Sequence, residues 1–86
     1  MYRITFKKSA AKELEHLPAK IVKNISPAIN NLSENPRPDG CKKLKGSQEG
    51  AWRIRIGDYR VLYIIDDIVR IIDIQKVGHR KDIYKH

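Results

Sequence analysis

The sequence predicts a single α+β domain, residues 1–86, in which a small antiparallel sheet is covered on one face by two helices. Three observations favour this fold. Apolar and polar residues alternate over residues 2–6 and again over much of 52–77, which is the period of half-buried strands. The region between them repeats apolar residues at three- and four-residue spacing, as an amphipathic helix does. Finally, 86 residues are too few to divide into several cores.

The first half of the chain is expected to form one edge strand and two helices. Ser9 is a suitable N-cap for a helix over about residues 10–16, which Pro18 then ends. Pro27 lies inside the second helix and is expected to kink or split it, because proline removes a backbone donor. The apolar stripe of this second helix consists of Ile21, Ile25, Ala28, Ile29 and Leu32.

The second half is expected to hold a connector, a basic loop and a three-strand meander. The turn-rich connector ENPRPDG precedes a loop in which Lys42, Lys43 and Lys45 surround Leu44. Strands are predicted for WRIRI, YRVLYII and IVRIIDIQKV, separated by the two-residue turns GD and DD. Glycine at the first position of the first turn suits a type II′ hairpin.

Two-residue turns would set the register of the whole meander. The expected pairs are Ile56 with Tyr59, Arg55 with Arg60, Ile65 with Ile68, and Arg60 with Asp73. The face that the helices should cover then holds Trp52, Ile54, Ile56, Tyr59, Val61, Tyr63, Ile65, Ile68, Ile72 and Ile74. The opposite face holds Arg53, Arg55, Arg60, Asp73 and Gln75 beside an apolar strip of Leu62, Ile64, Val69 and Ile71.

The arginines of this second face indicate an anionic partner. Eighteen Lys and Arg against ten Asp and Glu leave a formal charge of +8, which favours nucleic acid or an acidic protein. Two arginines directly opposite each other repel by a few tenths to about 1 kcal/mol, and a single aspartate cannot neutralise three. An anion pocket explains this arrangement. The structural alternative is that long arginine stems cover apolar surface while their heads reach water. The apolar strip is a candidate docking site for a partner helix.

Several classes of protein are excluded by the composition. Cys41 is the only cysteine, so the chain has no internal disulfide and no thiolate metal cluster. His16, His79 and His86 lack the spacing of metal ligands, and neither a metal nor a cofactor is expected. No apolar run reaches the roughly 20 residues that span a bilayer, and the N-terminus lacks the apolar core of a signal peptide. A cytoplasmic protein is therefore expected.

The tail GHRKDIY adds His79, Arg80 and Tyr84 to the candidate site. If it folds back over the arginine face, a phosphate between guanidinium groups would have an imidazole and a phenol nearby. RNA cleavage requires this chemistry, because the 2′-hydroxyl attacks its own phosphate and negative charge grows on the phosphate oxygens. Such a reaction needs no metal.

Three segments, NPRPDGCKKLKG, WRIRIGDYRVLYII and VGHRKDIYKH, resemble the RelE/ParE superfamily of toxin–antitoxin toxins, and the RelE branch in particular. The resemblance covers nearly the whole chain. It implies an antiparallel sheet backed by two helices and an endonuclease that cuts mRNA in the ribosomal A site. It also implies a RelB-like antitoxin that wraps around the toxin and holds it inactive.

The resemblance also implies which residues form the site. The family's basic and aromatic site positions match Arg53, Arg55, Arg60, Arg80 and Tyr84, although Tyr84 follows Arg80 more closely than in the best-known members. Those members carry lysines at the first two positions. Since arginine does not give up a proton at neutral pH, Arg53 and Arg55 are assigned to phosphate binding and charge stabilisation.

Three further residues are expected to assist. The imidazole of His79, with an ordinary pKa of about 6.5, could transfer the proton, or could simply be a polar turn residue. Lys43 and Lys45 are expected to hold the backbone of the mRNA or of ribosomal RNA.

Two other functions stay open at this point. One is ParE-like inhibition of DNA gyrase without nuclease activity, and the other is that of a decayed toxin that only binds its partner.

Overall fold

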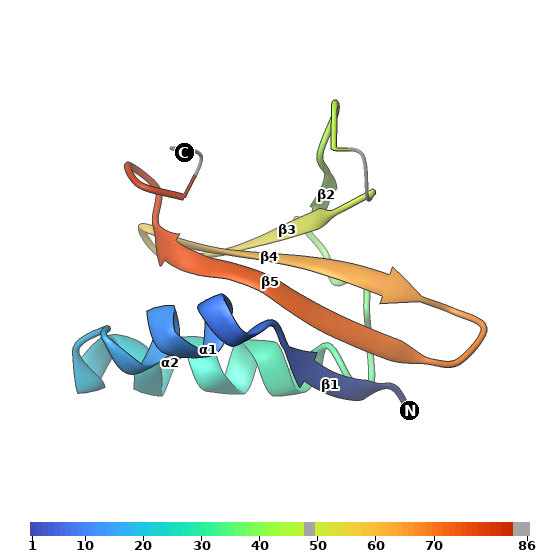
Figure 1. The fold of residues 1–86 in the computed structure, drawn as a ribbon, viewed down its shortest axis with the longest axis horizontal. Coiled ribbons are helices and arrows are strands. Elements are labelled where there is room, and N and C mark those ends of the chain that lie inside the picture. Colours follow the sequence, from blue (N-terminus) through green and yellow to red (C-terminus); the bar gives the residue numbers. More distant parts are fainter. Residues whose placement is uncertain (48–49, 84–86) are drawn as a thin grey trace.

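A five-stranded sheet carries two helices on one of its faces, as Figure 1 shows. The computed structural model describes residues 1–47 and 50–83. In chain order the elements are β1 (Arg3–Phe6), α1 (Lys8–Glu15), α2 (Ala19–Asn31), β2 (Lys42–Lys43), β3 (Trp52–Ile56), β4 (Tyr59–Asp66) and β5 (Ile71–His79). The strand order across the sheet is β1-β5-β4-β3-β2. The predicted α+β class, with both helices on one face, is confirmed.

The two edges of the sheet differ from the prediction. β1 runs parallel to β5, so the sheet is mixed and not antiparallel throughout. The chain leaves β1 through the helices, crosses to the far edge and returns strand by strand, and β5 arrives beside β1 in the same direction. The far edge is the short strand β2, where the sequence predicts only a loop. Its residues Lys42 and Lys43 pair with Arg53 and Trp52.

Helix α1 begins directly from the sheet, earlier than its sequence predicts. The N–H of Lys7 donates to the carbonyl of Ile74 at 2.9 Å, and the Lys7 carbonyl accepts from Ala11 at 3.0 Å. Lys7 is therefore the N-cap residue, without a side-chain cap bond, and Ser9 lies inside the first turn. The prediction that Ser9 caps this helix is wrong, because pairing with β5 sets where the helix starts.

Helix α2 starts after Pro18 as predicted and continues without interruption through Pro27. The carbonyl of Pro18 accepts the N–H groups of Ile21 and Val22 at 2.9 and 3.0 Å. A proline at position 27 deprives the carbonyl of Lys23 of its helical partner, and both residues are exposed, so water can serve that carbonyl. The prediction that Pro27 splits the helix is wrong.

The core lies between the helices and the sheet. Its buried side chains are Ala10, Ile25, Ile29, Leu32, Ile54, Val61, Tyr63, Ile72, Ile74 and Val77. This confirms the predicted stripe of α2 and most of the predicted sheet face. Among the described residues, no helix is long and apolar enough to cross a membrane.

The first hairpin has the predicted register. Ile56 pairs with Tyr59, and Arg55 pairs with Arg60. Gly57 has a φ of +60°, which a type II′ turn requires at its first position and which a residue with a side chain adopts only with strain.

The second hairpin reverses over a longer loop than predicted. β4 continues to Asp66, and residues 67–70 make the turn. The Oδ1 atom of Asp66 accepts the N–H groups of Ile68 and of the next residue at 3.0 and 3.1 Å, which stabilises this wider loop. Ile65 therefore lies opposite Ile72. The predicted pairing of Ile65 with Ile68 is wrong, and Ile68, expected in the core, is 93% exposed.

A bulge then shifts the register of β5 by one more residue. Leu62 pairs with Lys76, whereas the next residue, Tyr63, pairs with Ile74, so Gln75 is left as the extra residue. A one-residue shift turns every later side chain to the other face of the sheet.

The bulge decides which residues face away from the helices, on what we call the open face. Val77 enters the core, and Lys76 and Gly78 face the open side, with Gly78 directly opposite Arg60. The predicted pairing of Arg60 with Asp73 is wrong. The carboxylate of Asp73 instead accepts hydrogen bonds from side chains of β1 and β5.

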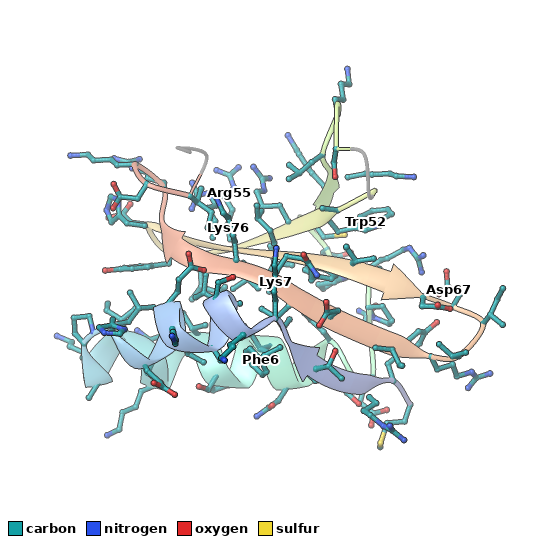
Figure 2. All side chains as sticks on the ribbon, in the orientation of Figure 1. Phe6, Lys7, Trp52, Arg55, Asp67 and Lys76 are labelled. Carbon is teal, nitrogen blue, oxygen red and sulfur yellow. The ribbon has the colours of Figure 1, made fainter. Side chains whose placement is uncertain are left out.

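A hydrogen-bonded group ties the β4–β5 loop to the N-terminus and to the connector after α2. The Tyr2 hydroxyl donates to Asp67 Oδ1 at 2.6 Å, and Arg37 Nη2 donates to Asp67 Oδ2 at 2.8 Å. The guanidinium of Arg37 also lies 5.2 Å from the ring centre of Trp52. Figure 2 shows Asp67 near the loop and Trp52 on the neighbouring part of the sheet. The connector is thereby held beside β3.

Asp67→Asn is expected to make the stability of the protein less sensitive to acid. Hydrogen bonds from Arg37 and then Tyr2 hold the pKa of the Asp67 carboxyl below its ordinary 3.8. Because the folded-state pKa is the lower one, the carboxylate stabilises the fold above about pH 4, and this contribution disappears as the pH falls through the folded value. The difference in unfolding free energy between wild type and variant, measured by urea denaturation, should shrink to nothing in acid.

Asp39→Asn is the matched control, since Asp39 is exposed on the same connector and makes no ion pair with a described residue. The difference in unfolding free energy between Asp39→Asn and wild type should not change over the same pH range. A difference for Asp67→Asn that is equally large at neutral and strongly acid pH would contradict the proposed ion pair.

Candidate functional site

The basic end of the open face combines side chains from three neighbouring strands. Arg53 and Arg55 come from β3, Arg60 from β4 and Lys76 from β5, and the register places all four on the same side of the sheet. Figure 2 shows Arg55 and Lys76 on the side away from the helices. None of the three arginines makes an ion pair with a carboxylate among the described residues. The predicted arginine face is therefore present, without the aspartate that was expected to balance it.

Arg53 has buried hydrogen-bond donors that no atom of the described residues accepts. Its Nε and Nη2 atoms are buried and have no partner among the described residues. A buried donor without an acceptor costs about 1–3 kcal/mol, and more when it is charged. The planar guanidinium fork matches two oxygens of a phosphate. Both atoms have almost no accessible surface, so an anion would satisfy these donors once the side chains that cover them move aside.

Arg60 is the most buried of the three arginines, with an exposed fraction of 9%. Its Nη1 atom donates to the carbonyls of Gly57 and Tyr59 at 3.1 and 3.0 Å. These hydrogen bonds stabilise the β3–β4 turn. The positive charge of the Arg60 guanidinium remains next to Arg55. We infer that Arg60 contributes charge and rigidity, whereas Arg55 is exposed and free to reach a ligand.

His79 lies on the face of the sheet that carries the helices, opposite to the arginines. It pairs with Tyr59, whose ring it meets edge-on at 5.4 Å, and it lines a cavity beside α1. Its Nδ1 atom accepts the N–H of Lys81 at 3.1 Å, so the neutral imidazole carries its proton on Nε2. His79 was predicted to lie near Arg55 and Arg60, but it faces the other way because the bulge precedes it in β5.

The sequence left open whether the tail folds back over the arginine face, and it does so up to its last described residue, Ile83. The N–H of Arg80 donates to the carbonyl of Asp58 at 2.8 Å, and its side chain lies 3.8 Å from the carboxylate of the same residue. Ile83 is buried, with 4% of its surface exposed. Tyr84, predicted to be catalytic, lies outside the described residues.

The basic residues of β2 divide between the two faces. Lys42 pairs with Arg53 and joins the open face, whereas Lys43 lies with its Nζ atom 6.0 Å from the ring centre of Trp52. Lys45 is exposed in the turn that follows β2. Of the lysines in this segment, Lys42 is the one beside the arginine face, although the sequence analysis assigns RNA binding to Lys43 and Lys45.

Sequence reasoning missed Lys42 and Lys76 as members of the basic end. One signal for Lys76 is present in the sequence, because the apolar positions of β5 change their spacing from two residues to three before Val77. Nothing comparable marks Lys42, whose strand is only two residues long.

The open face continues into an apolar and acidic end. Thr5, Ile64, Asp66, Ile71 and Asp73 line a shallow cavity there. Three residues of the predicted apolar strip, Leu62, Ile64 and Ile71, lie on this face, whereas Val69 is exposed in the loop. Within residues 1–47 and 50–83, no group of three or more His, Cys, Asp or Glu side chains could hold a metal ion.

Comparisons with known proteins agree with this fold. A family model described as "ParE toxin of type II toxin-antitoxin system, parDE" matches residues 4–84. The putative toxin RelE1 of Methanocaldococcus jannaschii is 38% identical over 90 residues, covering 99% of this chain and 97% of its own length. Toxin RelG of Mycobacterium tuberculosis is 36% identical over 85 residues, covering 98% of this chain and 97% of its own length.

Solved structures show the same arrangement. The RelE–RelB complex from Pyrococcus horikoshii matches with a TM-score of 0.80 and 29% identity, covering 94% of this chain and 97% of that one. The toxin–antitoxin complex RelBE2 from Mycobacterium tuberculosis matches with a TM-score of 0.80 and 32% identity, covering 92% and 98%.

The chain therefore belongs to the RelE/ParE superfamily of toxins from type II toxin–antitoxin systems. Relatives at 34–38% identity include toxins named RelE1, RelE and RelE3, beside RelG, which confirms the predicted RelE-like branch.

Proposed function

We propose that this protein is a metal-independent endoribonuclease that cleaves mRNA in the ribosomal A site. The single observation that carries the proposal is Arg53, whose buried donors have no partner within residues 1–47 and 50–83 and which shares a face with Arg55, Arg60 and Lys76. A cluster of positive charge with unused N–H groups suits a phosphate that gains negative charge during reaction. The names of the relatives support a RelE-type toxin.

The 2′-oxygen of RNA bonds to the adjacent phosphorus as the 2′-hydroxyl gives its proton to water, and the bond to the 5′-oxygen breaks as that oxygen takes up a proton from water. Arg53 and Arg55 bind the phosphate and stabilise its growing charge, and Arg60 adds charge from a rigid position. Arg80 neutralises charge from the tail side, and Tyr84 is proposed to contact the reacting nucleotide. His79 faces the helices, so we assign no proton transfer to it in this conformation.

A RelB-like antitoxin is the proposed partner. The solved neighbours include complexes between a RelE toxin and a RelB antitoxin. An antitoxin segment with apolar side chains suits the strip formed by Leu62, Ile64 and Ile71 on the open face. Lys42, Lys43 and Lys45 are proposed to hold the backbone of mRNA or ribosomal RNA, by charge rather than by sequence.

The purified protein is expected to cut mRNA on programmed ribosomes at the A-site codon. Since the attacking group is the 2′-hydroxyl, the upstream fragment should end in a 2′,3′-cyclic or 3′-phosphate. Primer extension locates the cut, and treatment of the fragment with a phosphatase that acts on such ends identifies them. Cleavage should persist when a chelator removes transition metals while enough Mg²⁺ remains to keep the ribosomes intact. Uncut mRNA, from a folded preparation that binds ribosomes, would refute the proposal.

Inhibition of DNA gyrase is the second candidate, because the matching family model is described as a ParE toxin. Gyrase-dependent DNA breaks on expression of the protein, together with intact mRNA, would favour it. A chain that binds its antitoxin yet causes no growth arrest when expressed alone would point instead to a decayed toxin.

A further inference from the structure

The C-terminal turn, residues 79–83, is packed against the basic end of the open face. The carbonyl of His79 accepts the N–H groups of Asp82 and Ile83 at 2.8 and 3.0 Å, which closes one helical turn. A Cβ atom added to Gly78, directly opposite Arg60, would lie 3.6 Å from the Cδ1 atom of Ile83. Figure 1 shows the chain after β5 rising on the side of the sheet away from the helices. The turn thus lies beside the arginines.

Lys76 connects this turn to the sheet. Its Nζ atom lies 3.3 Å from the carbonyl oxygen of Ile83, in a part-buried hydrogen bond. The last carbonyls of a helical turn have no partner within the turn, and they favour a cation. The ammonium of Lys76 serves one of them, and the bulge in β5 is what places Lys76 on the required face.

The position of Lys76 has an electrostatic cost that its contact with the turn offsets. Like charges on neighbouring positions of a sheet face destabilise it, and Lys76 stands beside the arginine cluster. A hydrogen bond in which the donor is charged is stronger than a neutral one. A lysine at this site therefore both raises the positive charge of the face and holds the chain that leaves it.

We propose that Lys76 is a positioning residue, which holds the C-terminal turn of residues 79–83 against the arginine face so that this turn meets the bound RNA in one fixed position. The functional part of this inference rests on the proposed nuclease activity. The structural part does not, because the contact between Lys76 and Ile83 can be tested without RNA.

Lys76→Met and Lys76→Arg test the proposal, and Lys23→Met, on the exposed face of α2, is the matched control. Methionine keeps much of the lysine stem and removes the donor, whereas arginine keeps the charge and the donor. In Lys76→Met, loss of one charge-assisted hydrogen bond should speed amide exchange at Asp82 and Ile83 by about tenfold. Single-turnover cleavage on saturating ribosomes should slow by about tenfold with ribosome affinity unchanged. Lys76→Arg should restore most of the exchange protection and most of the cleavage rate, and Lys23→Met should match wild type in both measurements.

Two results would overturn the positioning role. Slower cleavage with unchanged exchange would mean that Lys76 acts on the RNA and not through the turn. Faster exchange with full cleavage would mean that the position of the turn does not matter. If the wild-type chain leaves mRNA intact, the nuclease proposal and the functional part fail together, and the exchange data still decide whether Lys76 holds the turn.

Discussion

Arg53→Met is expected to slow mRNA cleavage on the ribosome by about 100-fold or more, because removal of one donor that stabilises a developing negative charge has an effect of this size. Methionine keeps much of the apolar stem that packs on the sheet and removes the two buried N–H groups. Those groups have no acceptor in the part of the chain that the structure describes, so the fold should not weaken. The single-turnover rate at saturating ribosomes measures the effect, and urea denaturation checks the fold.

Arg3→Met is the matched control for this variant. Arg3 is exposed on β1, opposite Ile71 and at the far end of the sheet from the basic cluster, so its loss should leave cleavage unchanged. The cleavage rate of Arg53→Lys should lie between those of Arg53→Met and Arg3→Met, since lysine keeps the charge but cannot bind two phosphate oxygens at once as a guanidinium does. Full activity in Arg53→Met would remove Arg53 from the site.

Ile72→Ala is expected to lower the free energy of unfolding by about 2–5 kcal/mol, a large part of the roughly 5–15 kcal/mol that a small domain has. Ile72 is fully buried in β5, between Ile4 of β1 and Ile65 of β4. The truncated side chain leaves a cavity that strands on both sides restrain from collapsing. Urea denaturation at neutral pH measures the loss.

Two variants show whether this effect belongs to the observed register. Ile72→Val removes one methyl group and should cost about 0.5–1.5 kcal/mol. Ile68→Ala should cost almost nothing, because Ile68 is 93% exposed in the β4–β5 loop. The two-residue turn predicted from the sequence would place Ile68 in the core, so a large loss of stability in Ile68→Ala would contradict the observed loop.

The first hairpin shows how far local sequence can determine a site. Its turn has two residues, and Gly57 readily adopts the positive φ that the type II′ turn needs. From this turn alone the alternation of side chains follows, so the pairing of Arg55 with Arg60 and their placement away from the helices could be predicted.

The register of the second hairpin could not be predicted from local sequence. Its loop is stabilised by Asp66. Strict alternation along β5 would turn the apolar Val77 toward the open face, and the extra residue Gln75 places Val77 in the core instead. Neither feature has a unique sequence signal. One extra residue moved His79 to the helical face and brought Lys76 to the arginines.

By itself, the sequence determined the α+β class, both helices and the first hairpin, because these depend on short-range periodicity and on turn residues that act locally. The family followed from the resemblance of three segments to known toxins. The tertiary structure alone decided the parallel placement of β1, the strand β2, and the set of residues that share the basic face. Those depend on strand pairing between distant segments, and in a sheet with a side-chain period of two a single inserted residue reverses which face every later residue occupies.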